Sequence, residues 1–134
     1  MSPPVTILGH GIDLVEVARV RGLFRAHGER FGARCFTPEE RDYCLGHRDP
    51  APHLAGRLAT KEAAFKALAP PGGPGAGTAW TDFEVVRHAT GQPLLRVQGR
   101  AAEIARARGI TGWLVSLSHT GTHAVASVIA TGPA

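Results

Sequence analysis

Several residue types that often reveal the class of a protein are scarce in this chain. Among its 134 residues there are two cysteines, one methionine and one tyrosine, and aromatic residues make up only 6%. Neither Cys35 nor Cys44 has a partner at the spacing of a zinc motif, so we expect no zinc site. Their number alone allows a disulfide, but two isolated thiols without an export signal are more often reduced.

Long hydrophobic stretches are also missing. No segment approaches the roughly 18 uninterrupted apolar residues that cross a membrane. The N-terminal segment has neither the basic region nor the cleavage-site pattern of a secretory signal. We therefore expect a cytoplasmic protein that has no membrane partner. The length suits a single domain over residues 1–134, and 43% hydrophobic residues are enough to form its core.

Positive charge, by contrast, is in excess. The formal net charge is +4, and all but two of the 15 basic residues are arginines. The planar guanidinium of arginine suits phosphates and carboxylates. The excess therefore fits an anionic partner such as nucleic acid, a phosphorylated cofactor or an acidic protein. A solvated, arginine-rich surface explains the same charge about equally well.

The spacing of hydrophobic residues predicts both strands and helices. We expect strands over residues 5–12, 82–87, 93–97, 113–118 and 123–130, and helices from residue 13 onward and over 37–45, 53–68 and 100–108. Gly9 and Gly11 in the first strand indicate a close approach of another backbone. The prolines and glycines of 70–77 predict a loop. This order of elements predicts an α+β fold, with a small antiparallel sheet packed against helices.

Asp13 is the first candidate for chemistry. It follows Gly-His-Gly-Ile at the expected junction of strand and helix, and it has apolar neighbours on both sides. An aspartate at the start of a helix is ordinarily an N-cap, which contributes about 1 kcal/mol. A functional interpretation becomes stronger if a second carboxylate occupies a similar setting elsewhere.

Glu62 is that second carboxylate. It shares a face of the predicted helix with Lys66, four residues later, and Arg57 lies loosely on the same side. One interpretation is a simple ion pair of about 0.2–0.5 kcal/mol. The many alanines around Glu62 favour a second interpretation, because a helix with such small side chains lets a bulky ligand or another backbone come close. Two carboxylates from separate elements, with basic residues beside them, suit Mg²⁺ held against the phosphates of a substrate.

A polar stretch ends the strand expected over residues 113–118. Ser116, His119 and Thr120 there can hold a phosphate or a ribose, although a lone histidine in such a place is more often hydrogen-bonded within the structure. Ser116 is not surrounded by the Gly-x-Ser-x-Gly pattern of a hydrolase nucleophile. The glycine-rich loop over 70–77 lacks the Lys-Ser/Thr ending of a nucleotide-binding P-loop.

Taken together, these segments resemble the holo-acyl-carrier-protein synthase family of phosphopantetheinyl transferases. The resemblance spans nearly the whole chain and rests on residues 11–17 (GIDLVEV), 34–40 (RCFTPEE), 55–66 (AGRLATKEAAFK), 80–93 and 116–120 (SLSHT). The aspartate motif alone is weak and the Lys-Glu-Ala helix is moderately specific. The two motifs together, in this order and at this separation, are a strong signature.

The resemblance implies a Mg²⁺-dependent enzyme that transfers 4′-phosphopantetheine from coenzyme A to a serine of apo-acyl carrier protein, releasing 3′,5′-ADP for fatty-acid synthesis. Asp13 and Glu62 are implied to bind Mg²⁺ and, with Lys66, to form the catalytic group. A metal-bound water or a nearby carboxylate would take the serine proton. The implied coenzyme contacts are Arg57, Lys61, Lys66, Ser116, His119 and Thr120, and the implied contacts to the carrier protein are Arg19, Arg30 and Arg34.

The same resemblance implies a phosphopantetheinyl transferase-like fold that assembles as a homotrimer, with the site at the subunit interface. His119 is then expected to act on the coenzyme of a neighbouring subunit. A different class, a small basic nucleic-acid-binding module without catalysis, also fits the charge. It has no run of Lys and Arg and no aromatic-basic pattern to support it, and it leaves Asp13 and Glu62 without a role. We therefore expect no nucleic-acid partner.

Overall fold

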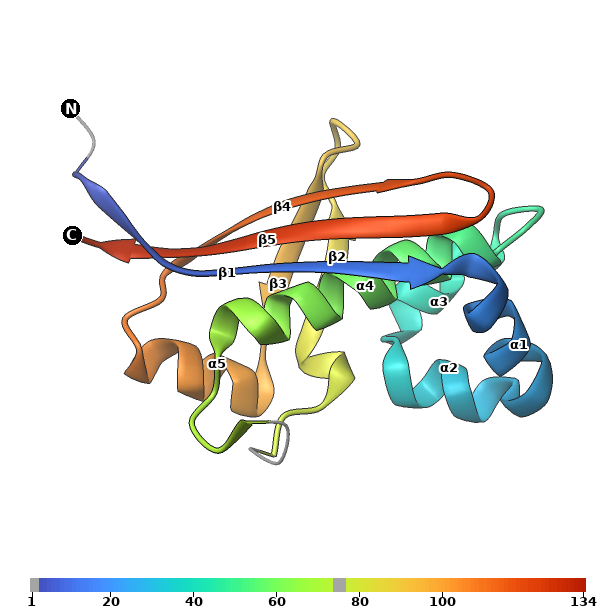
Figure 1. Cartoon of the computed structure of the whole chain (residues 1–134), viewed down its shortest axis with the longest axis horizontal. Coiled ribbons are helices and arrows are strands. Elements are labelled where there is room, and N and C mark those ends of the chain that lie inside the picture. Colours follow the sequence, from blue (N-terminus) through green and yellow to red (C-terminus); the bar gives the residue numbers. More distant parts are fainter. Residues whose placement is uncertain (1–2, 74–76) are drawn as a thin grey trace.

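A long helix packs across one face of a three-stranded antiparallel sheet in the computed structural model, which describes residues 3–73 and 77–134 (Figure 1). Strand β5 (His123–Pro133) is the central strand. It pairs with β1 (Val5–Glu16) on one side and with β4 (Gly112–His119) on the other. Helix α4 (Ala51–Leu68) lies against β1 and β5. The predicted α+β class is confirmed.

The other elements gather around α4. Near one end of the sheet lie three helices, α1 (Val17–His27), α2 (Glu29–Cys35) and α3 (Pro38–Leu45). A second sheet is formed by β2 (Phe83–Arg87) and β3 (Pro93–Val97). A 3₁₀ turn, η2 (Trp80–Asp82), precedes this sheet, and α5 (Gly99–Ala107) follows it. No helix in the described part of the chain is long and apolar enough to cross a membrane.

The first strand is longer than predicted. It runs to Glu16 instead of ending at residue 12, because β5 continues to pair with it as far as His123. Asp13 therefore lies inside the strand, opposite Ala126, and its interpretation as a helix N-cap is wrong. The helix expected from residue 13 begins only at Val17.

Helix α3 begins as the sequence predicts. The Thr37 hydroxyl accepts a hydrogen bond from the backbone N–H of Glu40 at 3.3 Å, and the Glu40 carboxylate accepts one from the backbone N–H of Thr37 at 3.0 Å. Helix α2 was not predicted, because seven residues are too few to show a clear period. The predicted loop over 70–77 falls partly on residues 74–76, which lie outside the described residues.

Glycines let the first strand lie directly on α4. A Cβ atom at Gly9 would be 2.0 Å from the carbonyl oxygen of Ala67, and one at Gly11 would be 1.9 Å from the carbonyl oxygen of Ala63. Any larger residue would push the two backbones apart. The close approach predicted from these glycines is confirmed, and the alanine-rich helix faces a backbone along this side.

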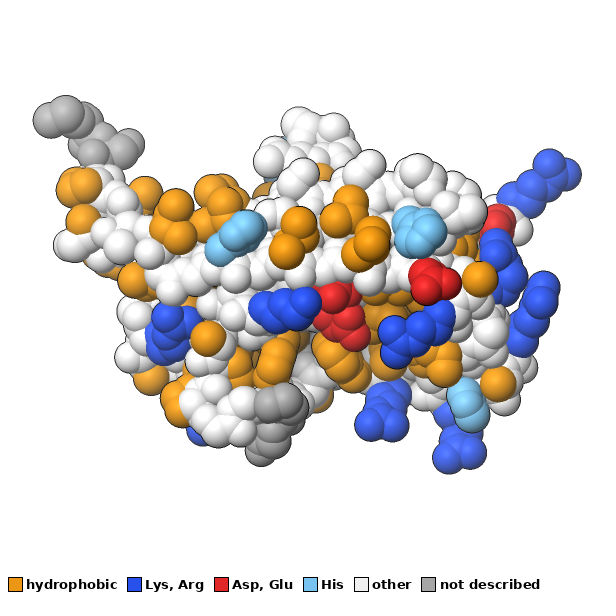
Figure 2. Space-filling model, in the orientation of Figure 1, with side chains coloured by type: hydrophobic (Ala, Val, Ile, Leu, Met, Phe, Trp, Pro, Cys, Tyr) orange, Lys and Arg blue, Asp and Glu red, His pale blue; other side chains and the backbone are white. Residues whose placement is uncertain are grey.

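The opposite face of the sheet carries exposed hydrophobic side chains. Ile12 and Leu14 of β1 and Leu114 of β4 are 57% to 65% exposed, and Val5 and Ile7 are more exposed still. Figure 2 shows hydrophobic side chains following the strands across this part of the surface. An apolar face of this kind is larger than scattered surface hydrophobic residues and is typical of an interaction surface.

Candidate active site

Asp13 and Glu62 meet where β1 crosses α4. Asp13 projects from the side of β1 that packs on the helix, and Glu62 precedes Ala63, whose carbonyl group abuts Gly11. The two carboxyl groups are close enough to share a hydrogen bond when one of them is protonated. Partial burial of Glu62, followed by this hydrogen bond and by the negative charge of Asp13, raises the pKa of Glu62 to about 7.

Lys66 joins the two carboxylates from the next turn of α4. Its ammonium group lies 3.2 Å from Asp13 Oδ1 and donates to the carbonyl oxygen of Ile12 at 3.0 Å. The lysine thus reaches across to the strand, and its ion pair is with Asp13. The Lys66 side chain is 55% exposed, so this pair contributes little to stability and leaves the ammonium accessible from solvent.

One oxygen of Asp13 has no partner. Oδ2 is buried without a hydrogen bond from any described residue, although the Asp13 side chain as a whole is 14% exposed. A buried carboxylate oxygen left in this way is costly unless a cation or another donor satisfies it. It points to a ligand at this place.

The donor set fits Mg²⁺. Magnesium usually takes one or two carboxylates from a protein and completes its shell with phosphate oxygens and water. Asp13 and Glu62 supply two carboxylates from different elements, and one of them has a free, buried oxygen. Across residues 3–73 and 77–134, no group of three or more His, Cys, Asp or Glu is arranged so that it could hold a metal ion.

A cavity of about 490 Å³ opens beside Glu62. Its lining includes Trp80 and the three arginines that the resemblance implies as contacts to the carrier protein, Arg19, Arg30 and Arg34. A second cavity of about 320 Å³ shares Arg34 and Trp80 with the first. Basic side chains gather over α1 and α2 in Figure 2. The fold therefore places three predicted arginines next to one predicted carboxylate.

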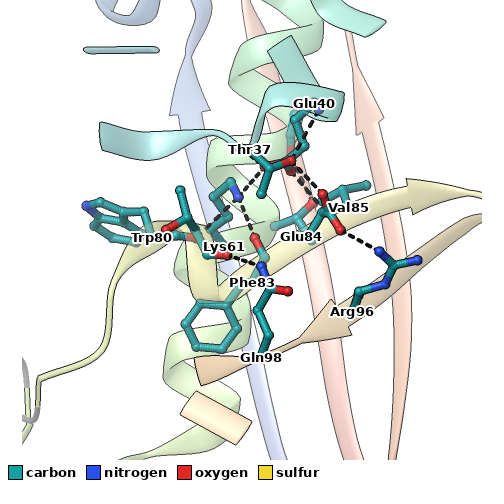
Figure 3. A network of polar contacts seen from close by, with 12 residues as sticks. Thr37, Glu40, Lys61, Trp80, Phe83, Glu84, Val85, Arg96 and Gln98 are labelled. Atoms are coloured by element: carbon teal, nitrogen blue, oxygen red, sulfur yellow. Dashed lines mark hydrogen bonds and ion pairs between the residues drawn. The ribbon is translucent and has the colours of Figure 1, made fainter. Parts of the chain in front are cut away.

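The Lys61 side chain is buried in the core of the chain, although the resemblance implies that it contacts the coenzyme. Its side chain is 0% exposed, and its ammonium group donates to Glu40 Oε1 at 2.6 Å and to the carbonyl oxygens of Trp80, at 3.2 Å, and Phe83 (Figure 3). One step along a helix turns a side chain by about 100°. Lys61, one position before Glu62 on α4, therefore points away from the Glu62 side chain and into the protein core.

Arg57 also points away from Glu62, so its predicted place on that side of the helix is wrong. The guanidinium lies 4.2 Å from the centre of the Tyr43 ring, and the residue is buried. Five positions along a helix correspond to about 140° around its axis, which explains the divergence. Buried Nε of Arg57 has no hydrogen-bond partner among the residues that the structure describes.

His119 lies near Arg57 in a group that sequence reasoning did not find. Its ring is 5.3 Å from that of His53, which stacks on His47 at 3.7 Å and an interplanar angle of 24°. Burial, followed by the neighbouring charges of His47 and His119, lowers the pKa of His53. His47 and His53 flank a proline-containing turn, and no motif in the sequence links them to His119.

Ser116, His119 and Thr120 stand apart from Asp13 within one chain. They belong to β4 and the turn after it, and β5 separates β4 from β1. Ser116 lies in register with Ile12 through β5, on the face of the sheet turned away from α4. The Thr120 hydroxyl accepts hydrogen bonds from two backbone N–H groups of its own turn. Within a single chain, Asp13, Glu62 and Lys66 therefore lie together, whereas the polar end of β4 lies apart from them.

The chain is similar to known proteins over most of its length. Residues 9–126 match the 4′-phosphopantetheinyl transferase superfamily, and the chain belongs to that superfamily. Within it, the chain is 48% identical to the holo-[acyl-carrier-protein] synthase of Desulforudis audaxviator, over 95% of both sequences. It is 43% identical to the holo-[acyl-carrier-protein] synthase of Koribacter versatilis, over 92% of this chain and 97% of that one.

Solved structures show the same similarity. The Mycobacterium tuberculosis acyl carrier protein synthase is 34% identical, with a TM-score of 0.69 over 96% of this chain and all of that one. The Helicobacter pylori holo-[acyl-carrier-protein] synthase, solved in complex with coenzyme A, is 28% identical, with a TM-score of 0.77 over 90% of this chain and 98% of that one. Both likenesses cover at least 90% of this chain.

Proposed function

We propose that this chain transfers 4′-phosphopantetheine from coenzyme A to a serine of an apo-acyl carrier protein and releases 3′,5′-ADP. The observation that carries the proposal is the meeting of Asp13, Glu62 and Lys66 around a buried carboxylate oxygen that has no hydrogen-bond partner among the described residues. The names of its relatives support the substrates, because they are holo-[acyl-carrier-protein] synthases and one was solved with coenzyme A.

Asp13 and Glu62 would hold Mg²⁺, which when bound neutralises negative charge on the diphosphate of coenzyme A. Lys66 contributes a second positive charge from the exposed side of the site, where it can contact a phosphate oxygen. The serine oxygen bonds to the β-phosphorus, and the bond from that phosphorus to the bridging oxygen breaks. The 3′,5′-ADP leaves with the electron pair, and the serine proton passes to a carboxylate or a water at the site.

The arginines beside Glu62 would receive the carrier protein. Arg19, Arg30 and Arg34 line one cavity together with Glu62, so an acidic partner bound there presents its serine close to the carboxylates. Complementary charge of this kind acts mainly on the rate of association. Reversal of Arg19 to Glu should therefore weaken carrier binding and leave coenzyme affinity nearly unchanged.

We also propose that the working form is a homotrimer. The apolar outer face of the sheet supports an assembly, since Ile12, Leu14 and Leu114 are mostly exposed in a single chain. An assembly also gives His119, distant from Asp13 in its own chain, a route to a neighbour's coenzyme. Residues of the β4 end would then complete the site across the subunit boundary. We place this trimer in the cytoplasm, in the service of fatty-acid synthesis.

Mass spectrometry tests the proposed function. Apo-acyl carrier protein incubated with the enzyme, coenzyme A and Mg²⁺ should gain the mass of one phosphopantetheine. The gain should disappear with EDTA and in Asp13→Ala and Glu62→Ala, and it should persist in Arg96→Met, which removes a surface arginine remote from the site. An unmodified carrier after incubation with the wild-type enzyme, for every carrier tried, would rule the proposal out.

A further inference from the structure

Lys61 is the centre of a buried network that the proposed mechanism does not use (Figure 3). An ammonium group has three hydrogen-bond donors. Those of Lys61 are all taken, by a carboxylate oxygen of Glu40 and by the backbone carbonyls of Trp80 and Phe83. The acceptors belong to α3, η2 and β2, so a single side chain of α4 is tied to three other elements.

Glu40 extends the network to a second strand contact and to the surface. Its Oε2 accepts from the backbone N–H of Val85 at 3.0 Å, and its Oε1 accepts from that of Thr37 at 3.0 Å. The Thr37 hydroxyl donates to Glu84 at 2.6 Å, and the other oxygen of Glu84 accepts from the exposed Arg96 at 3.1 Å. A rotation of α4 would strain several of these buried bonds at once.

Glu62 lies between this network and the first strand. Lys61 precedes it and is anchored to α3, η2 and β2, whereas Ala63 follows it and has its carbonyl group against Gly11. The helix is therefore held on both sides of the residue that faces Asp13. The backbone of Glu62 has little freedom to turn or slide.

The same ammonium group also fixes the cavity. The carbonyl of Trp80 accepts a hydrogen bond from Lys61, and Trp80 is one of the residues that line the cavity beside Glu62. One buried charge thus connects the helix that carries the carboxylate with the segment that forms part of the surrounding wall. Neither contact requires Lys61 to reach solvent.

We propose that Lys61 is a positioning residue, which holds Glu62 and Trp80 at a fixed separation across the cavity without touching the coenzyme. This inference rests on the proposed role of Glu62. A misplacement of about 1 Å at a catalytic group can cost roughly 100-fold in rate. Loss of an outer partner of a metal ligand costs about 10- to 100-fold in metal affinity.

The double variant Lys61→Met/Glu40→Gln tests the proposal, since it removes both members of the ion pair and leaves neither charge unpaired. We expect a folded protein by circular dichroism, with kcat for carrier modification lowered roughly 100-fold. In the presence of coenzyme A, the Kd for Mn²⁺, measured from the free-ion EPR signal, should rise at least about tenfold. Arg96→Met, at the exposed end of the same network, should leave both quantities unchanged.

Trp80 supplies a readout that needs no catalysis. With Trp113→Phe as the background, Trp80 is the remaining tryptophan, and its emission should shift to longer wavelength in the double variant as the η2 segment loosens. A folded double variant with wild-type emission, Mn²⁺ affinity and kcat would overturn the proposal and leave Lys61 a purely structural residue.

Two further outcomes are distinguishable. If the double variant does not fold, Glu40→Gln alone, whose amide oxygen can still accept from Lys61, should show changes of the same kind, and unchanged values there would refute the inference. If the wild-type enzyme modifies no carrier, the proposed function fails. Mn²⁺ affinity and Trp80 emission then still decide whether Lys61 positions Glu62.

Discussion

Two groups of charged residues flank the same turn of α4 and are built in opposite ways. Around Lys61 every donor of the ammonium group has an acceptor, and the ion pair with Glu40 is fully buried. Around Glu62 one oxygen of Asp13 is buried without a described partner, and two carboxyl groups lie against each other. Lys61 in the first group directly precedes Glu62 in the second.

The difference separates a structural network from a binding site. Buried charges that are fully paired tie elements together, whereas buried like charges with a free oxygen are unfavourable until a cation arrives. Residue type does not distinguish them, since both groups combine lysine with carboxylates. What distinguishes them is whether each buried polar atom has a hydrogen-bond partner. The following predictions test this difference, beginning with the largest expected effect of a substitution on the free energy of unfolding.

Loss of Lys61 alone should destabilise the fold most. Lys61→Met leaves the Glu40 carboxylate buried and uncompensated, which typically costs about 3–5 kcal/mol. Arg96→Met removes an arginine that is 65% exposed and leaves the buried Glu84 with its hydrogen bond from Thr37, so we expect a smaller loss of about 1–3 kcal/mol. Urea unfolding at equal protein concentration measures both. Similar losses in the two variants would show that burial does not set the importance of Lys61.

The contact between the strand and α4 should be next in size. Gly11→Ala places a Cβ against the Ala63 carbonyl, and overpacking of this kind costs about 1–3 kcal/mol. It should also lower transfer activity, because it pushes Asp13 away from Glu62. Gly22→Ala, in α1 with open space around it, should instead stabilise the protein by about 0.5–1 kcal/mol. Thermal unfolding that fails to separate these variants would contradict the close packing.

Removal of a site carboxylate should have the opposite effect on stability. Glu62→Gln abolishes the repulsion between two adjacent carboxylates, so we expect the metal-free protein to keep its stability or gain up to about 1 kcal/mol, while carrier modification is lost. Calorimetry in EDTA and mass spectrometry of the carrier measure the two effects. A marked loss of stability would assign Glu62 to the structural group.

Stability should also depend on pH. Since the pKa of Glu62 is raised from 4.5 to about 7, the folded chain retains a proton that the unfolded chain releases. The contribution of this group to stability is therefore full below pH 4.5 and is lost as the pH rises through 7. Magnesium needs the deprotonated form.

Added Mg²⁺ should therefore raise Tm more at pH 8 than at pH 5.5. In Glu62→Gln the gain from Mg²⁺ should be small at both pH values. A gain from Mg²⁺ that is equal at both values in the wild-type protein would argue against Glu62 as a ligand. Differential scanning fluorimetry over this pH range gives the comparison.

Much of the fold could be predicted where the signal is local. The capping box of Thr37 and Glu40, the close approach at Gly9 and Gly11, and the strands of both hairpins follow from neighbouring residues, and the structure confirms them. The end of the first strand was missed because β5, a partner far along the chain, sets it. Helix α2 was missed because its seven residues are too few to show a period.

The sequence by itself determined which chemical groups the protein has, the order of its elements and the family to which it belongs. Only the tertiary structure decided which way each group on α4 points. Lys61 turns to the core, Arg57 to Tyr43, and Glu62 and Lys66 to Asp13. Helical spacing gives the angles between side chains but not the orientation of the helix about its axis. The packing of β1, α3 and β2 sets that orientation.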